Sequence, residues 1–144
     1  MPTDTMFKSS QIGRQFTYLE LPDIVYMKLQ GMVTLEEARQ INEVHREYSQ
    51  DVSHFFYLID LGDLDDLPAS VRKEASEAVK DFPLRGTVVC NAPLRAKVLA
   101  KLLLTAANLF RKGQQSNPVF FADSEEEGRA LIEKRRKQVA PAAA

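Results

Sequence analysis

The stretch Phe55-Phe-Tyr-Leu-Ile-Asp-Leu-Gly-Asp-Leu-Asp-Asp-Leu-Pro-Ala-Ser70 decides the fold. Its apolar start is typical of a strand that is covered on both faces. The apolar run ends at Asp60, and the acid-rich segment that follows indicates a loop over residues 60–70. Pro68 then suits the first turn of a helix. The stretch therefore predicts a strand, a loop and a helix, and in open α/β sheets functional groups gather where strands end in such loops.

Apolar periodicity extends this pattern along the chain. Residues 14–21, which alternate imperfectly, are expected to form a first strand and residues 24–29 a second. The short link between them predicts an antiparallel hairpin. Further strands are expected at 55–59, 85–90 and 119–121, and the expected helices begin at the capping box of Thr34, at Ala69, at Leu94 and at Asp123 or Ser124. The order ββαβαβαβα predicts an α/β fold, with a mixed, mostly parallel five-stranded sheet and four helices.

Composition narrows the classes of function. The chain has 144 residues and a formal net charge of −1, which gives no electrostatic reason to expect nucleic acid. The single cysteine, Cys90, lies in a β-branched run and is expected in the core, in a reducing compartment. The most apolar stretch, residues 98–110, is shorter than the ~20 residues that span a bilayer. We expect a cytoplasmic protein that is not transmembrane, with one domain at residues 14–137 and flexible termini at 1–13 and 138–144.

Four segments carry a resemblance to a known family. They are the hairpin Phe16–Leu29 that ends at Gly31, the helix start at Val33–Ala38, the segment Leu58–Leu61, and Val119–Ala130 before the last helix. Together with the order of elements, they resemble the SpoIIAA-like branch of the STAS superfamily over residues 14–137. The resemblance implies a STAS-like fold and, by fold-level analogy, a shape similar to the lipid-binding fold of the Sec14 type.

The resemblance also implies a candidate phosphorylation site. In the anti-sigma antagonists of this branch, a partner kinase phosphorylates a serine at the start of the helix after the third strand. Ser70 lies close to that position, but its surroundings, Leu67-Pro-Ala-Ser70-Val71, depart from the family's Asp-Ser-Ser-Gly type of sequence. The alternative is an ordinary serine in the first turn of a helix.

Charged and polar residues near residues 60–70 and 91–95 are the candidate partner-binding or phosphorylation residues. These are Asp60, Asp63, Asp66, Ser70, Asn91 and Arg95. The carboxylates, together with Asp65, suggest a metal site or an acidic docking patch, but the EF-hand spacing is not met, so a solvated loop is favoured and no metal is expected. Asn91 and Arg95 flank a helix start, which can bind an anion or can be an ordinary cap beside an exposed arginine.

No catalytic or cofactor motif accompanies these residues. His45 and His54 lack zinc-ligand spacing, and we expect the first on a helix surface and the second in a loop. Nucleophile-elbow, P-loop and dinucleotide-binding patterns are missing, so no cofactor and no enzymatic activity are expected.

The helix expected at residues 94–111 is apolar over a broad arc. Its inward stripe is expected to contain Leu94, Val98, Leu102, Ala106 and Leu109, with Lys97, Lys101 and Arg111 beside it. This arc indicates either a well-buried helix or the wall of a lipid or small-ligand pocket, for which Leu99, Leu102, Leu103 and Phe110 are the candidates. It also favours a homodimer through this helix or the preceding one.

Two functions follow. The first is a noncatalytic, regulatory module of SpoIIAA-like type that binds a partner protein near residues 60–70. The second is a carrier of a lipid or small apolar ligand, with helix 94–111 lining the pocket.

Overall fold

The computed structural model describes residues 6–109, 111 and 116–139. Within these ranges the strands are β1 (Met6–Ile12), β2 (Gln15–Glu20), β3 (Ile24–Met32), β4 (Phe55–Asp66), β5 (Leu84–Cys90) and β6 (Val119–Ala122). The helices of the same ranges are α1 (Leu35–Ser49), α2 (Ala69–Val79), α3 (Leu94–Leu109) and α4 (Glu125–Val139).

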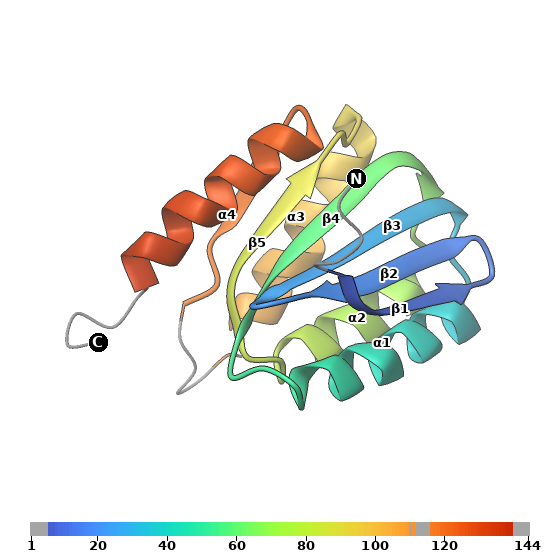
Figure 1. Cartoon of the computed structure of the whole chain (residues 1–144). Coiled ribbons are helices and arrows are strands. Elements are labelled where there is room, and N and C mark those ends of the chain that lie inside the picture. Colours follow the sequence, from blue (N-terminus) through green and yellow to red (C-terminus); the bar gives the residue numbers. More distant parts are fainter. Residues whose placement is uncertain (1–5, 110, 112–115, 140–144) are drawn as a thin grey trace.

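The strands lie side by side in sequence order (Figure 1). Strands β1, β2 and β3 are antiparallel, whereas β3, β4, β5 and β6 are parallel. The predicted mixed α/β class is confirmed, but the described part of the sheet has six strands instead of five. The added strand covers residues 6–12, which the sequence pattern assigns to a flexible terminus. Its polar Lys-Ser-Ser-Gln sequence lacks the apolar alternation by which a strand is recognised. Backbone hydrogen bonds to β2 hold it at the sheet edge.

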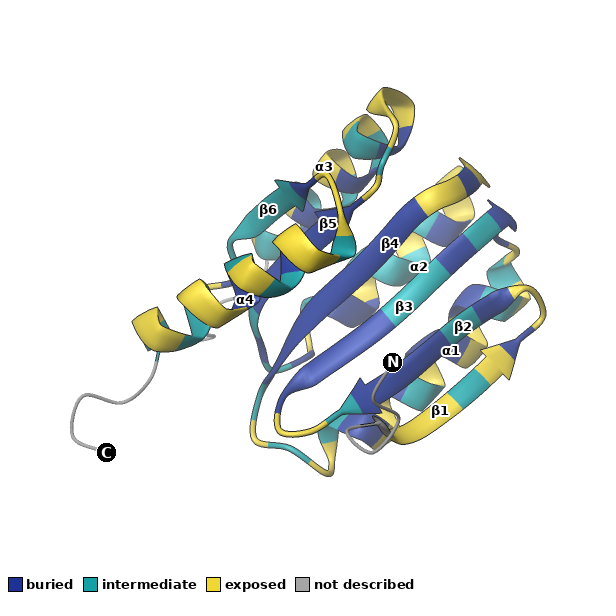
Figure 2. Cartoon of the chain, turned by 45° about the horizontal axis from the view of Figure 1, so that its top comes forward, coloured by how far each residue is buried: buried dark blue, intermediate teal, exposed yellow. Residues whose placement is uncertain are grey.

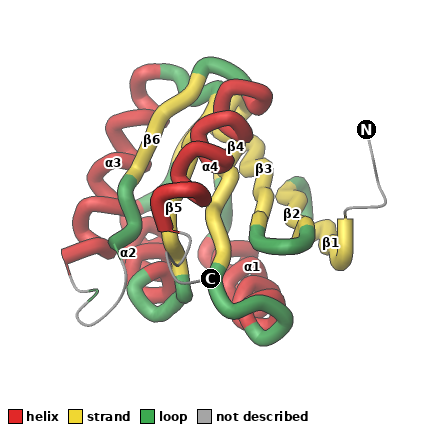
Figure 3. The backbone as a smooth tube through the Cα atoms, turned by 60° about the vertical axis from the view of Figure 1, so that its left-hand side comes forward, coloured by secondary structure: helices red, strands yellow, loops and turns green. Residues whose placement is uncertain are grey.

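The helices form two layers around the sheet. Helices α1, α2 and α3 cover one face, and α4 covers the other (Figure 3). The larger core lies under the three helices, and the smaller one lies under α4, where Ile132 packs near Leu58 and Val88. Figure 2 shows that β4, in the middle of the sheet, is buried along most of its length, whereas β1 is largely exposed. A strand covered on both faces is the arrangement that the apolar run at 55–59 predicts.

Side-chain caps fix the starts of two helices. At α1, Thr34 Oγ1 accepts from the Glu37 backbone N–H at 3.1 Å, and the Glu37 carboxylate accepts from the Thr34 backbone N–H at 3.0 Å. At α4, Ser124 Oγ accepts from the backbone N–H of Glu127 at 3.1 Å. Both predicted helix starts are confirmed, because the hydroxyl and carboxylate groups satisfy N–H groups that a helix leaves without partners.

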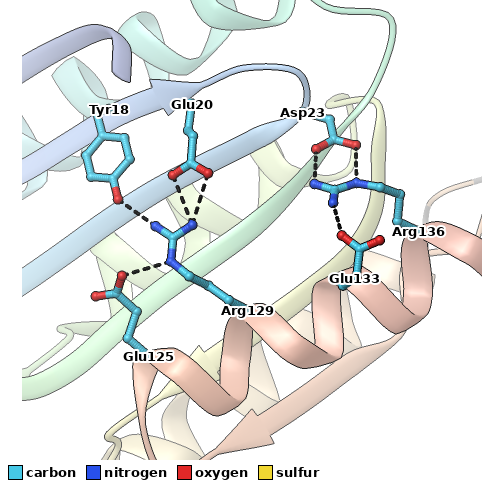
Figure 4. A network of polar contacts seen from close by, with 7 residues as sticks. All are labelled: Tyr18, Glu20, Asp23, Glu125, Arg129, Glu133 and Arg136. Atoms are coloured by element: carbon cyan, nitrogen blue, oxygen red, sulfur yellow. Dashed lines mark hydrogen bonds and ion pairs between the residues drawn. The ribbon is translucent and has the colours of Figure 1, made fainter. Parts of the chain in front are cut away.

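Two arginines of α4 attach this helix to β2 and to the turn between β2 and β3 (Figure 4). The Arg129 guanidinium donates to the Tyr18 hydroxyl at 2.8 Å, to Glu20 at 3.0 Å and to Glu125 at 3.0 Å. One side chain thereby joins the first turn of α4 to β2, which is distant in sequence.

Arg136 makes the second attachment, near the other end of α4 (Figure 4). Its guanidinium binds both carboxylate oxygens of Asp23, at 3.0 Å and 2.5 Å, and also contacts Glu133. Asp23 is buried at the turn between β2 and β3. Because a bidentate pair of this kind fixes orientation as well as distance, α4 is held in one position across the sheet.

Candidate functional site

Strand β4 is longer than its sequence indicates. It continues past Asp60 to Asp66 while paired with β3, whereas β5 ends at Cys90, opposite Asp60. The loop expected at residues 60–70 is therefore corrected to strand as far as Asp66. This strand projects beyond its neighbour β5, at the edge where the parallel strands end.

Register shifts explain why the pattern of this segment misleads. Strand β3 also continues, through Gly31, and its pairing with β4 shifts between Lys28 and Gln30 and again between Gly31 and Met32. Gly31 has φ +65, a left-handed backbone conformation that favours glycine, and a Cβ there would also displace the end of the Arg14 side chain. Such shifts break the two-residue alternation by which a strand is recognised.

Asp60 and Asn91 are brought together at the ends of β4 and β5. The Asn91 side-chain amide donates to Asp60 Oδ2 at 3.3 Å, and the Gly62 backbone N–H donates to Asp60 Oδ1 at 2.9 Å. Asn91 adopts φ 62, which places it outside the helical region, and α3 begins three residues later at Leu94. The cap expected of Asn91 is corrected, because its side chain contacts the Asp60 carboxylate. The contact between Asp60 and Asn91 lies where the buried part of β4 ends.

Asp66 and Asp63 have separate basic partners. Asp66 Oδ1 accepts from Arg95 at 3.4 Å and from the backbone N–H of Leu67 at 2.9 Å. Asp63 lies 3.3 Å from Lys28 Nζ. The partners of Asp60, Asp63 and Asp66 therefore come from three separate places, the residue after β5, strand β3 and helix α3. Within the described ranges, no group of three or more His, Cys, Asp or Glu side chains is arranged to hold a metal ion.

Ser70 is exposed in the first turn of α2. The N-cap of that helix is Pro68, which makes no side-chain hydrogen bond to the turn. The hydroxyl of Ser70 is thus accessible at the positive end of a helix dipole, where added negative charge is favourable. Its accessibility is compatible with modification, which stays a prediction.

Apolar side chains accompany these charges at the surface. Met32 is 60% exposed and is the register partner of Asp66, and Leu94 is 77% exposed beside Arg95. Sequence reasoning missed Met32 because the predicted strand ends at Gly31. We call the surface formed by Met32, Asp63, Asp66, Ser70, Leu94 and Arg95 the carboxyl edge. It combines exposed apolar groups with opposite charges.

A second feature is an apolar cavity of about 80 Å³ between the sheet and helices α1, α2 and α3. Its walls contain Ile59 and Leu61 of β4 together with Val71 and Val79 of α2, and Asn42 and Tyr57 are the polar residues of the lining. A cavity of this size exceeds the space that one water needs, and a lining so poor in polar groups favours an apolar occupant.

Helix α3 contributes different residues to this cavity than its sequence suggests. Among the four predicted pocket residues, Leu103 lines the cavity and Leu99 is partly buried against the core. Leu102 is instead 62% exposed on the other side of the helix, and the Phe110 side chain lies outside the described residues.

The buried face of α3 is the alanine-rich one. Its buried residues are Ala96, Ala100, Leu104 and Ala107, whereas the expected inward stripe is at the surface. This prediction is therefore wrong. Small side chains allow a helix to approach its neighbours closely, so the face with less apolar bulk faces the core. We call Leu94, Val98, Leu102 and Leu109, the large exposed residues of α3, the outer stripe.

A buried hydrogen-bond chain runs from the cavity wall into the sheet. The Tyr57 hydroxyl contacts His45 Nδ1 at 2.8 Å, and His45 Nε2 contacts Thr17 Oγ1 at 2.9 Å. Thr17 in turn donates to the Tyr26 carbonyl at 2.6 Å, so His45 Nε2 carries the proton that Thr17 accepts, and Nδ1 accepts from Tyr57.

Burial lowers the pKa of His45 to about 3, and the ring is neutral at physiological pH. The expectation of a helix-surface histidine is corrected. His45 lies four residues after Ile41 and three before Tyr48, a spacing that places all three on one buried face.

Arg111, which the sequence analysis placed beside the apolar stripe of this helix, is another buried residue. Its guanidinium donates to the carbonyls of Val79 at 3.0 Å, Phe82 at 2.9 Å and Leu84 at 2.9 Å. It thereby satisfies carbonyls at the end of α2 and the start of β5, where a positive charge also suits the helix dipole. Its spacing from Leu104 and Ala107 continues the buried face of α3. This spacing is the sequence signal that could have identified Arg111 as buried.

Two further predictions have outcomes in the described residues. Cys90 is fully buried, and burial raises the pKa of its thiol to about 11, so it is a core residue as expected. None of the helices in the described ranges is both long and apolar enough to cross a membrane.

Comparison with known proteins identifies the fold. No family model matches the sequence, and no curated protein matches it. Among solved structures, the chain is similar to an uncharacterized protein of the DUF3478 family from Shewanella loihica PV-4, which has a SpoIIAA-like fold. The two share 16% sequence identity with a TM-score of 0.56, over 81% of this chain and 89% of that protein. The fold is therefore SpoIIAA-like, as the sequence resemblance implies.

Proposed function

We propose that this chain is a noncatalytic protein-interaction module that binds a regulatory partner at the carboxyl edge. The observation that carries the proposal is the exposure of Met32 and Leu94 beside the Asp66–Arg95 pair. Large apolar groups that are exposed together and bordered by charge are typical of protein-binding surfaces.

The charges of this edge suit reversible binding. Arg95 is mostly exposed and reaches Asp66 at 3.4 Å, so its guanidinium can exchange this partner for a carboxylate of another protein. Ser70 lies one residue into α2, close in sequence to the same pair. Its phosphorylation would add about −2 charge at a helix start and change which partner surfaces are complementary.

The hydrogen bonds and burial of Asp60, His45 and Cys90 favour a noncatalytic role. Both oxygens of Asp60 already accept hydrogen bonds, from Gly62 and Asn91. His45 is enclosed with both ring nitrogens engaged, and the Cys90 thiol is buried. Asp60, His45 and Cys90 belong to residue types that commonly serve as base or nucleophile, and their engagement or burial supports the noncatalytic proposal.

A pull-down from the native host with the tagged chain tests this proposal. We expect a specific protein to be retained at physiological salt. The double variant Met32→Ser, Leu94→Ser should reduce its retention at least tenfold, because it removes two apolar side chains that the complex would bury. Lys134→Ser, on α4 at the opposite face, is the matched surface control and should retain the partner. Recovery of no specific protein, or equal recovery by both variants, would contradict the proposal.

The cavity favours a second candidate function, the binding of a small apolar ligand. Its space of about 80 Å³ is partly open and is lined by side chains of all three helices on that face. Because an engineered cavity of roughly 150 Å³ takes up benzene, this one suits only a small molecule or the end of a longer apolar chain.

Native mass spectrometry and organic extraction of the purified protein test the second candidate. A bound apolar molecule that is lost when Ala100→Leu fills the cavity would support it. The same molecule should remain bound in Leu102→Ala, which changes the outer side of α3. A clean mass without ligand, together with no fatty-acid uptake, would remove this function.

A further inference from the structure

The outer stripe of α3 is a continuous apolar line on the surface. Its four side chains are between 50% and 77% exposed. They follow one another at intervals of four, four and seven residues, which are the spacings that keep side chains on one face of a helix. From Leu94 to Leu109 the line runs for about 22 Å at 1.5 Å per residue. This surface begins at the carboxyl edge and continues away from it.

The charged residues of α3 that border the outer stripe are all basic, and one of them, Arg95, pairs with Asp66 of β4. Arg95 borders it on one side, and Lys97 and Lys101 border it on the other. The 16 residues of α3 contain no aspartate or glutamate. The helix therefore presents an apolar line with a basic border on both sides.

We propose that the outer stripe binds an acidic amphipathic helix of about four turns in a partner protein. The inference rests on the proposed interaction function and names the kind of segment that the partner supplies. An apolar face of such a helix would cover the four exposed side chains, as amphipathic helices do when they pack into apolar surfaces. Carboxylates on its flanks would lie near Arg95, Lys97 and Lys101, which gives charge complementarity and a faster association.

Two other occupants fit α3 less well. A second copy that packs α3 against α3 would bring basic borders together, because the helix has no carboxylate to oppose them. A bilayer surface is bound by helices whose whole polar face is strongly charged, whereas the face of α3 opposite the outer stripe is alanine-rich and buried in the core. These occupants, including the predicted homodimer, become outcomes of the test.

The experiment measures binding of two designed peptides to the whole chain by fluorescence anisotropy. Both are helical and about 16 residues long, with one leucine face, and they differ only in carrying glutamate or lysine on the flanks. We expect the acidic peptide to bind at least tenfold more tightly at low salt, and the difference to shrink as salt is added. The double variant Lys97→Glu, Lys101→Glu should reverse the preference.

Matched variants separate the outer stripe from the rest of the surface. Lys134→Glu with Lys137→Glu changes the net charge equally on α4 and should keep the preference for the acidic peptide. Leu102→Ser should weaken the acidic peptide about tenfold, as the loss of a central apolar contact does. Circular dichroism of each variant checks that it is folded.

Three results would overturn the inference. One is equal binding of the two peptides. Another is binding to vesicles of mixed phosphatidylcholine and phosphatidylglycerol that the acidic peptide does not displace. The third is a dimer mass in light scattering that Leu102→Ser abolishes. If the host pull-down still succeeds in those cases, only this inference fails, whereas loss of both results would also remove the proposed function.

Discussion

Helices α3 and α4 cover opposite faces of the same sheet but meet solvent differently. Helix α4 is rich in charge, and Arg129 and Arg136 tie it to β2 and to the turn after it. Helix α3 turns its alanines inward and its largest aliphatic side chains outward. Two arginines of α4 are thus used within the molecule, while α3 exposes large aliphatic side chains with basic residues beside them, which supports its proposed role as a binding surface.

The largest difference in the free energy of unfolding is expected between variants of two leucines of α3. Leu104 is buried and lines the cavity, so Leu104→Ala should lower the free energy of unfolding by about 3 kcal/mol, through lost burial and an enlarged cavity. Leu102→Ala, two residues away on the outer stripe, should change it by less than about 0.5 kcal/mol. Urea unfolding of both variants measures the difference. Equal losses would place both leucines in the core and remove the comparison.

On α4, removal of an attachment should be costly. Arg136→Ala leaves the buried carboxylate of Asp23 without its bidentate partner, and we expect a loss of about 2 kcal/mol, reduced from the fully buried case because Arg136 is partly exposed. Lys134→Ala, on the same helix, is the control and should be close to neutral. Thermal unfolding compares the two, and a neutral Arg136→Ala would show that α4 is not fastened as described.

His45 lies on the face of the sheet that α3 also covers. Its burial predicts that the free energy of unfolding depends on pH. The folded pKa of His45, about 3, lies below its ordinary value of 6.5, so its stabilising contribution is present above pH 6.5 and is lost as the pH falls toward 3. At pH 5 the loss should be about 2 kcal/mol relative to pH 7, since each pH unit below 6.5 costs about 1.4 kcal/mol. The pH slope of unfolding in the wild type, set against His45→Gln, isolates this contribution. An unchanged slope in the variant would contradict it.

The smallest effect is expected at the carboxyl edge. The Arg95–Asp66 pair is exposed, and Arg95→Ala should reduce the free energy of unfolding by no more than about 0.5 kcal/mol, less at high salt. The same variant should nevertheless weaken retention of the partner. A loss of stability comparable to that of Arg136→Ala would assign Arg95 a structural role instead.

The order of the elements was predictable because periodicity and helix caps are local signals. The capping box at Thr34 and the serine cap at Ser124 place the starts of α1 and α4 correctly. Strand β1 was missed because backbone pairing with β2, and not its side-chain pattern, defines it. The extension of β4 was missed because the bulge at Gly31 belongs to the neighbouring strand.

The candidate site was predictable in part for similar reasons. Asp60 with Asn91, and Asp66 with Arg95, meet because parallel strands end at one edge. The orientation of α3 could not be predicted from apolar periodicity alone, since both of its faces are apolar. The choice between them depends on close packing against α2 and the sheet, which favours the alanine face.

Photo-crosslinking in the native host tests most directly whether α3 and the carboxyl edge form the binding surface. A p-benzoylphenylalanine residue replaces Leu94 in one variant and Lys134 of α4 in the other, and crosslinked products are identified by mass spectrometry. If α3 and the carboxyl edge form this surface, we expect a specific protein to be crosslinked through position 94 and none through position 134. A specific crosslink through position 134 alone, or no crosslink through position 94, would contradict this expectation.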